Sequence, residues 1–330
     1  MKYTYLGRTG LKVSRLCLGT MNFGMRTDEK EAFAIMDKAL EAGINFIDTA
    51  NGYGRGEGGH AGWTEEIIGR WFAQGGDRRE KTVLAAKVFS AMGDDRDGPN
   101  EGDGLSAFKI RRHVEASLKR LQTDHIELYQ MHHIEPHATW QEIWGAFEPL
   151  VNQGKAYYIG SSNFGARHIA YAQAAADKRN FLGLVSEQHK YSLTCRLPEL
   201  ELIPTVQEQG MGLLLYSPLG GGMLSGNVLN PVAGSERAAG AAARLTPEQR
   251  AQLEAYAKLC NDLGESESNV ALAWLLANPV VTAPIVGPRT LAQFEEALRA
   301  VEIVLPEDFL AELDKIFPGP GGAAPQAYAW

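Results

Sequence analysis

Short apolar runs alternate along the chain with segments whose apolar residues recur every three or four positions. The first pattern is typical of buried strands and the second of amphipathic helices. The predicted strands are 15–20, 44–49, 81–88, 125–131, 156–162, 183–188, 211–217 and 283–287. The predicted helices between or after them are 28–43, 106–121, 139–154, 163–178, 197–210, 268–279 and 290–301. This alternation predicts an α/β fold, a (β/α)8 TIM barrel.

Helix boundaries and faces are readable in two of these segments. Asp28 is a good N-cap for the first helix, and Gly43 is expected to end it. The second helix is expected to start at Ser106. Its apolar residues, predicted to share one face, are Phe108, Ile110, Val114, Leu118 and Leu121.

Several segments exceed what a barrel repeat needs. Residues 2–14 are predicted to form an N-terminal β-hairpin, with GRTG as its turn. Residues 90–106 and 220–245 follow predicted strands, and we expect them to be long loops over substrate and cofactor. Residues 246–264 are an extra helix, and 318–330 are a C-terminal Pro/Gly tail. No linker divides the chain, so residues 1–330 are predicted to form a single domain.

The tail ends in aromatic residues at Tyr328 and Trp330. It can reach the open end of the barrel or a neighbouring subunit, and disorder is an equal alternative.

Composition narrows the class of protein. Hydrophobic residues make up 45% and charged residues 22% of the chain, as in an ordinary soluble enzyme. A formal net charge of -8 without a long basic run argues against nucleic acid as a partner. The three cysteines form no CxxC pair, which argues against a disulfide framework. With neither a signal peptide nor a membrane-spanning apolar run in evidence, we expect a cytoplasmic protein.

Four polar residues stand at or just beyond the ends of predicted strands: Asp48, Tyr53, Lys87 and His132. In a barrel of this type the carboxyl ends of the strands converge on one mouth, where the active site lies. A tyrosine acid, a lysine that lowers its pKa, a carboxylate that holds the lysine and a histidine donor suit carbonyl reduction. Taken singly, each residue has an ordinary structural explanation, such as a turn cap or an ion pair. Their combination at successive strand ends favours catalysis.

At these positions the chain resembles the aldo-keto reductase family, along nearly its whole length. The matching stretches are GRTGLKVSRLCLGTMNFG, NFIDTANGYG, AAKV, LYQMHH, IGSSNF, SEQHKY, YSPLGGGML and VGPRT. The resemblance implies that Asp48, Tyr53, Lys87 and His132 form the family's catalytic tetrad. It also implies that the N-terminal hairpin covers the bottom of the barrel.

The resemblance further implies a nicotinamide cofactor. Ser162, Asn163 and Gln188 would hold the carboxamide, and Tyr216 would stack on the nicotinamide ring. Backbone amides around Ser217, Leu219 and Gly221 would grip the pyrophosphate.

The adenosine half of the cofactor would be met after the eighth strand. Arg289 would bind the 2′-phosphate and favour NADPH over NADH, although a solvent-facing role at a helix start is the alternative. Gln293 and Glu296 lie where the family contacts adenine. Ala297 departs from the asparagine that is frequent in the family, so the resemblance does not carry one adenine contact over to this chain, though it still implies the cofactor.

Other side chains near the predicted mouth can shape the substrate pocket, though core packing is an equal alternative for each. They are Met21, Phe23, Trp63, Phe89 and His133.

Two further sequence patterns give little support for a function. Residues 54–59 match GxGxxG but do not lie at a tight strand-to-helix turn. The cluster from His132 to His137 has mixed ligand types, and a metal site is not expected.

The leading hypothesis is an NADPH-dependent reductase of small-molecule aldehydes or ketones, able to run in reverse. The motifs resemble bacterial members that act on small aldehydes and polyols or on nucleotide-linked deoxysugars, and they do not separate these groups. The same tetrad occurs in cytosolic subunits of potassium channels, so a cofactor-binding redox sensor is the alternative. A metal-dependent barrel hydrolase that uses the histidine cluster is a third hypothesis. The oligomeric state stays open.

Overall fold

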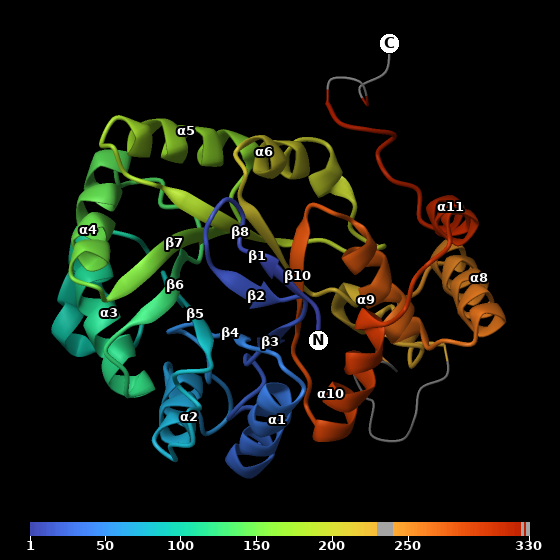
Figure 1. Cartoon of the computed structure of the whole chain (residues 1–330), viewed down its shortest axis with the longest axis horizontal. Coiled ribbons are helices and arrows are strands. Elements are labelled where there is room, and N and C mark those ends of the chain that lie inside the picture. The colour runs from blue at the N-terminus through green and yellow to red at the C-terminus, as the bar shows by residue number, and fades with distance from the viewer. Residues whose placement is uncertain (230–239, 325–326, 328–330) are drawn as a thin grey trace.

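The computed structural model describes residues 1–229, 240–324 and 327 (Figure 1). Its centre is a closed barrel of parallel strands in the order β10-β3-β4-β5-β6-β7-β8-β9. The strands are β3 (Cys17–Gly19), β4 (Phe46–Asp48), β5 (Val83–Val88), β6 (Ile126–Met131), β7 (Ala156–Ser162), β8 (Leu184–Lys190), β9 (Gly212–Tyr216) and β10 (Val281–Val286). Each predicted strand therefore exists, and the (β/α)8 prediction is confirmed.

Helices surround the barrel, as Figure 1 shows. They are α1 (Glu29–Glu41), α2 (Trp63–Phe72), α3 (Ala107–Leu121), α4 (Trp140–Asn152), α5 (Ala166–Asp177), α6 (Leu202–Glu208), α8 (Pro247–Leu263), α9 (Glu267–Ala277), α10 (Leu291–Ala297) and α11 (Glu307–Ile316). Short 3₁₀ helices are η1 (Asp95–Asn100), η2 (Leu197–Glu199), η3 (Gly220–Gly222) and η4 (Leu298–Val301). Asp28 and Ser106 cap α1 and α3 as predicted, because each side chain accepts a hydrogen bond from a first-turn amide.

The extra helix predicted at 246–264 is α8, which begins with a capping box at Thr246. The loop 90–106 contains η1, a short helix that the sequence did not suggest, and Gly98 interrupts its helical backbone. The predicted loop 220–245 falls partly outside the described residues, as do Tyr328 and Trp330 of the tail.

Two apolar layers hold the fold together. Inside the barrel, strand residues such as Phe46, Leu128 and Leu214 pack with Leu6 and Val13 from the hairpin. A larger layer fills the space between strands and helices. In α3, Ile110, Val114, Leu118 and Leu121 belong to that layer as predicted. Phe108 does not: it is 42% exposed, because it stands two positions from Ile110 and so points about 200° away around the helix.

The N-terminal hairpin of β1 (Tyr3–Tyr5) and β2 (Lys12–Ser14) lies across one end of the barrel (Figure 1). Arg8 donates its backbone N–H to the carbonyl of Gly210 at 2.8 Å, close to the start of β9. Gly7, at φ 55°, has no room for a side chain there, since an added Cβ would stand 2.6 Å from the amide nitrogen of Gly212. The hairpin therefore closes the bottom and leaves the opposite end for function.

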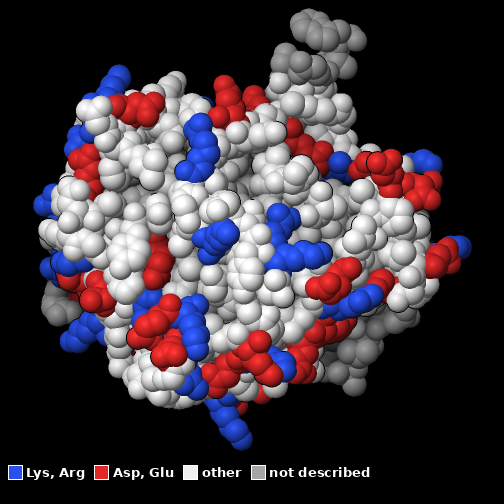
Figure 2. Space-filling view, in the orientation of Figure 1, with Lys and Arg blue, Asp and Glu red and all other residues white. Residues whose placement is uncertain are grey.

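On the hairpin side of the molecule, acidic and basic side chains are interspersed, with no large area of one sign (Figure 2). Among the described residues, no helix combines the length and apolarity needed to cross a membrane.

Candidate active site

Asp48 and Lys87 meet at the ends of two neighbouring strands. Asp48 is the last residue of β4, Lys87 is the penultimate residue of β5, and these strands pair in parallel. The Lys87 side chain has no exposed surface and forms an ion pair with Asp48. Its ammonium also donates to the carbonyl of Thr49 at 3.1 Å. Burial alone would lower the pKa of Lys87, but Asp48 and Tyr53 outweigh burial and raise it, so the ammonium stays charged.

Tyr53 lies in a turn beyond β4, and its hydroxyl is 3.0 Å from the ammonium of Lys87. The ammonium also lies 4.8 Å from the centroid of the Tyr53 ring. Burial raises the pKa of Tyr53, Lys87 opposes that rise, and the net direction is upward. Lys87 lowers the pKa of Tyr53 as predicted, but burial outweighs this effect in the protein alone. The phenol is held in its protonated, proton-donating form.

His132 directly follows β6, and its backbone N–H donates to the carbonyl of Val88 at 3.0 Å. Its ring meets the ring of Tyr53 edge to face, with centroids 5.9 Å apart. Burial, Lys87 and His133 lower its pKa from 6.5 to about 2, so the imidazole is neutral. Its Nδ1 is buried and has no hydrogen-bond partner among the described residues. A buried polar atom without a partner is a candidate contact for a ligand.

The carboxylate of Asp48 is also held by two glutamines. Its Oδ2 accepts from Nε2 of Gln130 at 3.0 Å and from Nε2 of Gln188 at 2.8 Å. Gln130 was not predicted, although it lies two residues before His132 on a strand that the sequence identified. The nitrogen of Gln188, expected to face the nicotinamide carboxamide, is directed at Asp48, so a ligand would have to be met by its oxygen.

Ser162, Asn163 and Tyr216 come together beside His132. Asn163 adopts the left-handed region at φ 62°, where a side chain other than glycine is uncommon. Its Nδ2 donates to the carbonyl of His132 at 3.0 Å, and its Oδ1 accepts from the Tyr216 hydroxyl at 2.7 Å. Non-glycine residues held in this region cluster at functional sites. The predicted nicotinamide residues are thus in contact with the predicted catalytic ones.

The turn after β9 carries the residues expected at the pyrophosphate. Ser217 also lies in the left-handed region, at φ 52°, and Gly221 follows at φ 71°. The amides of Gly220 and Gly222 are used inside the turn, by the carbonyls of Ser217 and Leu219, both at 2.9 Å. These two amides are therefore not available to a phosphate group, which would have to be bound by amides of neighbouring residues in the turn.

Arg289, Gln293 and Glu296 lie at the start of α10 and along it. The Gln293 side chain accepts from the backbone N–H of Arg289 at 3.0 Å, and Thr290 caps the helix. Thr27 donates to the carbonyl of Arg289 at 2.9 Å, which fixes this segment against the loop after β3. Gln293 and Glu296 are exposed, and Arg289 is half-buried.

Of the residues predicted for the substrate pocket, one is a core residue and the other four are at least partly exposed. Phe23 has no exposed surface and packs in the core, so its assignment to the pocket is wrong. Phe89 lies against His133, with ring centroids 5.3 Å apart, and His133 stacks on His132 at the same distance. Trp63 begins α2 and stacks on His60. Met21 is 56% exposed.

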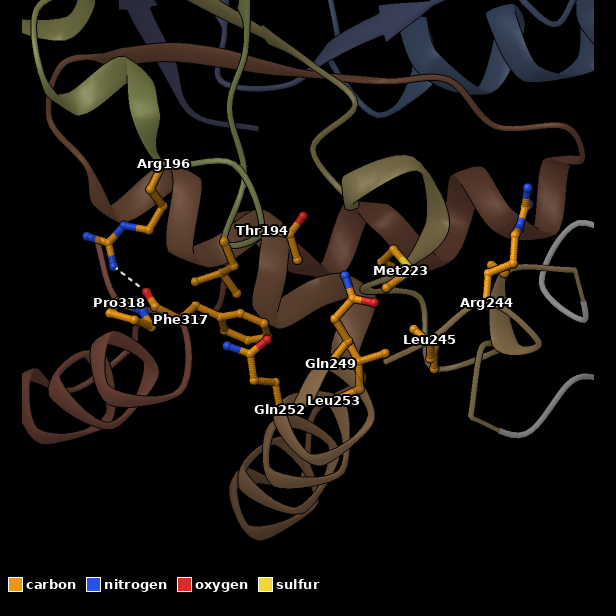
Figure 3. A pocket seen from close by; sticks show the side chains of 12 residues that line it. Thr194, Arg196, Met223, Arg244, Leu245, Gln249, Gln252, Leu253, Phe317 and Pro318 are labelled. Atoms are coloured by element: carbon orange, nitrogen blue, oxygen red, sulfur yellow. Dashed lines mark hydrogen bonds between the residues drawn. The ribbon is translucent and has the colours of Figure 1, made fainter. Parts of the chain in front are cut away.

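A cavity of about 600 Å³ lies near this end of the barrel (Figure 3). Its walls include Thr194 and Arg196 from the loop after β8, Met223 from the segment after β9, and Gln252 of α8. None of the four predicted catalytic residues lines it. Arg196 is engaged by Glu199, by Asp314 and by the carbonyl of Phe317. We assign no chemistry to this cavity.

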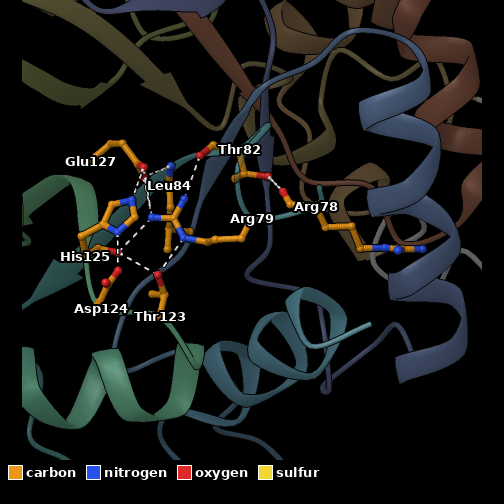
Figure 4. A network of polar contacts seen from close by, with 8 residues as sticks. All are labelled: Arg78, Arg79, Thr82, Leu84, Thr123, Asp124, His125 and Glu127. Carbon is orange, nitrogen blue, oxygen red and sulfur yellow. Dashed lines mark hydrogen bonds and ion pairs between the residues drawn. The ribbon is translucent and has the colours of Figure 1, made fainter. Parts of the chain in front are cut away.

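A second polar cluster lies at the starts of β5 and β6 (Figure 4). Arg79 binds the carboxylate of Glu127 at 3.0 Å and the carbonyls of Thr82 and His125. Glu127 also accepts from the amide of Leu84 at 2.8 Å. Because it joins the amino ends of strands, this cluster serves stability rather than catalysis. Among the described residues, no group of three or more His, Cys, Asp or Glu side chains is arranged to hold a metal ion.

Comparisons with known proteins identify the family of this chain. The sequence model of the aldo/keto reductase family matches residues 15–317. The chain belongs to the aldo/keto reductase family. It is similar to the uncharacterized oxidoreductase YrpG of Bacillus subtilis, at 61% identity over 100% of both chains. It is also similar to protein tas of Escherichia coli, at 32% identity over 96% of this chain and 97% of the relative. A probable voltage-gated potassium channel subunit beta of Arabidopsis thaliana is 31% identical over 92% of each chain. The chain is therefore an oxidoreductase, of a family that generally uses NAD(P)H.

Proposed function

We propose that this aldo/keto reductase reduces an aldehyde or ketone to the alcohol with NADPH, and that the reaction is reversible. The observation that carries the proposal is the buried Asp48–Lys87 pair with the Tyr53 hydroxyl 3.0 Å from the ammonium. Tyrosine, lysine and carboxylate in this order join a proton donor to a fixed positive charge.

The residues at the barrel mouth fit a nicotinamide cofactor. The left-handed Asn163 and Ser217, the half-buried Arg289 and the unpartnered Nδ1 of His132 surround one end of the barrel. Ser162, Asn163 and the oxygen of Gln188 would meet the carboxamide, and Tyr216 would meet the ring. Backbone amides near Ser217, Leu219 and Gly221 would meet the pyrophosphate. Arg289, with Gln293 and Glu296, would meet the adenosine 2′-phosphate and adenine.

When bound, the cofactor supplies a hydride to the carbonyl carbon. Tyr53 donates its phenolic proton to the carbonyl oxygen, so that the O–H bond breaks on the enzyme as a new one forms on the product. Lys87 stabilises the phenolate left behind, and Asp48 keeps Lys87 charged and in place. The neutral ring of His132 donates a hydrogen bond to the same oxygen as negative charge develops on it.

The substrate is a small-molecule carbonyl compound that enters between Met21, Trp63, Phe89 and His133. A cytoplasmic location agrees with the three free cysteines.

A second candidate function rests on the likeness to potassium channel subunits beta. An intact tetrad is compatible with a subunit that binds the cofactor tightly and turns over slowly. Fluorescence titration with NADPH and NADH, followed by turnover on methylglyoxal, 4-nitrobenzaldehyde, glyceraldehyde and a keto-sugar, separates the two. Tight NADPH binding with turnover supports the reductase. Tight binding without turnover favours the sensor, and binding of neither cofactor contradicts both.

A further inference from the structure

The catalytic Tyr53 is not on a strand, so strand pairing does not fix its position. It ends a turn in which its backbone N–H donates to the carbonyl of Ala50 at 3.2 Å. Asn51 and Gly52 are the central residues of this turn. A turn at a barrel mouth has several accessible conformations, and its side-chain contacts select one. The position of the proton donor therefore depends on what holds Asn51 and Gly52.

Contacts with Lys87, with Ser90 and with α3 hold the turn, and they include a long hydrogen bond of 3.5 Å from Nδ2 of Asn51 to the carbonyl of Ser90. The backbone N–H of Asn51 donates to the carbonyl of Lys87 at 3.1 Å. Gly52 lies so close to Ser90 that an added Cβ would stand 2.6 Å from its Oγ. The side chain of Asn51 is buried, and its Nδ2 lies 3.2 Å from Nδ1 of His113 on α3. His113 is 4% exposed and belongs to a helix whose other buried residues are mostly apolar.

The second ring nitrogen of His113 faces a different segment. Nε2 lies 3.1 Å from Oδ2 of Asp97, which is in η1 within the loop 89–104. This loop is closed at its base, where the amide of Gly104 donates to the carbonyl of Phe89 at 2.9 Å. Arg112 pairs with the other oxygen of Asp97 at 2.7 Å. One imidazole thus connects the turn of Tyr53 with the loop whose base presents Phe89 to His133.

The partners determine which nitrogen of His113 carries the proton. An amide nitrogen only donates, so Nδ1 must accept from Asn51, and Nε2 must carry the hydrogen given to Asp97. Burial lowers the pKa of His113, Lys109 and Arg120 lower it further, and Asp97 opposes them. The ring is therefore neutral and makes one donated and one accepted hydrogen bond. A side chain of similar volume without both functions cannot replace it.

We propose that His113 is a positioning residue for the carbonyl reduction proposed above: through Asn51 it fixes the turn that carries Tyr53, and through Asp97 it couples that turn to the loop 89–104. The inference rests on the proposed function for its catalytic consequence. The mechanical connection between turn and loop stands on the contacts alone.

The test compares His113→Leu, which keeps volume but loses both hydrogen bonds, with His113→Gln, whose amide can accept and donate. Hydrogen exchange followed by mass spectrometry reports on residues 50–54 and 89–104. Turnover of 4-nitrobenzaldehyde with NADPH and the Kd for NADPH are measured alongside. His125→Leu, at the opposite end of the barrel, is the matched control. Asn51→Ala breaks the same contact from the other side, should His113→Leu not fold.

We expect His113→Leu to speed exchange in both segments and to lower kcat by about 10- to 100-fold, as misplacement of a catalytic group by about 1 Å does. The Kd for NADPH should change less than about twofold, and His113→Gln should recover most of kcat. Unchanged exchange in 50–54 and 89–104 would overturn the inference, as would equal losses of kcat in the Leu and Gln variants. If the wild type binds NADPH and turns over no carbonyl, the proposed function fails, while the exchange comparison still decides the inference.

Discussion

The buried ion pair of Lys87 and Asp48 can be tested by removing each charge alone and then both. Lys87→Met deletes the ammonium and keeps an unbranched side chain in a position with no exposed surface. Asp48→Asn keeps the shape and deletes the negative charge. Each single change leaves one buried charge without its partner, which costs about 3–5 kcal/mol of unfolding free energy.

The remaining contacts rank the two single variants. Without Lys87, Asp48 still accepts from Gln130 at 3.0 Å and from Gln188 at 2.8 Å, so we expect a loss near 3 kcal/mol. Without a charged Asp48, the ammonium retains the carbonyl of Thr49 and the Tyr53 hydroxyl, both neutral, so the loss should approach about 5 kcal/mol. The double variant has no buried charge here and should lose only about 2 kcal/mol, for imperfectly satisfied amide groups.

Equilibrium unfolding in urea, followed by tryptophan fluorescence and circular dichroism, gives the four free energies of this double-mutant cycle. The double variant should be more stable than either single variant. If the two losses simply add, the charges do not interact and the reasoning is refuted. A Lys87→Met protein as stable as the wild type would also contradict it. Reductase activity should be lost in all three variants, so stability and catalysis are read separately.

Further predictions concern the proton donor, the cofactor and pH. Tyr53→Phe should lower kcat by about 10² or more, measured as NADPH consumption, since the acid is gone; a loss under threefold removes this assignment. Arg289→Ala should raise the KM for NADPH by about 10-fold or more and leave that for NADH nearly unchanged; equal effects on both cofactors argue against a 2′-phosphate contact. His132 is neutral with a pKa of about 2, so protons bind it only in the unfolded chain. The contribution of this buried neutral ring to the free energy of unfolding is complete above about pH 6.5. It falls by about 1.4 kcal/mol for each pH unit below that value. His132→Gln should therefore show a shallower acid loss of stability, and identical slopes would contradict the burial argument.

The sequence predicted the elements well where local signals were strong. The strand predicted at 156–162 is β7 (Ala156–Ser162), and the caps at Asp28 and Ser106 start their helices. Helix α2 was not predicted, because its N-cap is Gly62, which offers no side-chain hydrogen bond. Helix α11 was also missed. It starts after Pro306, again without a side-chain cap.

In the site, the sequence predicted which catalytic residues come together, but not whether burial or a neighbouring charge determines the pKa of each. The ends of β4, β5 and β6 bring Asp48, Lys87 and His132 together, as the repeat implied. Whether burial or Lys87 dominates the pKa of Tyr53 depends on packing that no motif records. Gln130 and His113 escaped notice for a related reason: each is a polar residue inside an apolar pattern, and its partner is distant in sequence.

The two halves of the chain contribute different parts of the site. The proposed catalytic residues, from Asp48 to His132, lie in the first half of the barrel. The residues proposed to hold the cofactor, from Ser162 to Glu296, follow β6 in the chain. Two contacts join the two sets, because Gln188 donates to Asp48 and Asn163 donates to the carbonyl of His132. The residues proposed for catalysis and those proposed to bind the cofactor are therefore encoded by separate stretches of the gene. Recombination with a relative between β6 and β7 would exchange the cofactor residues and leave the catalytic residues intact, provided that Gln188 and Asn163 are kept.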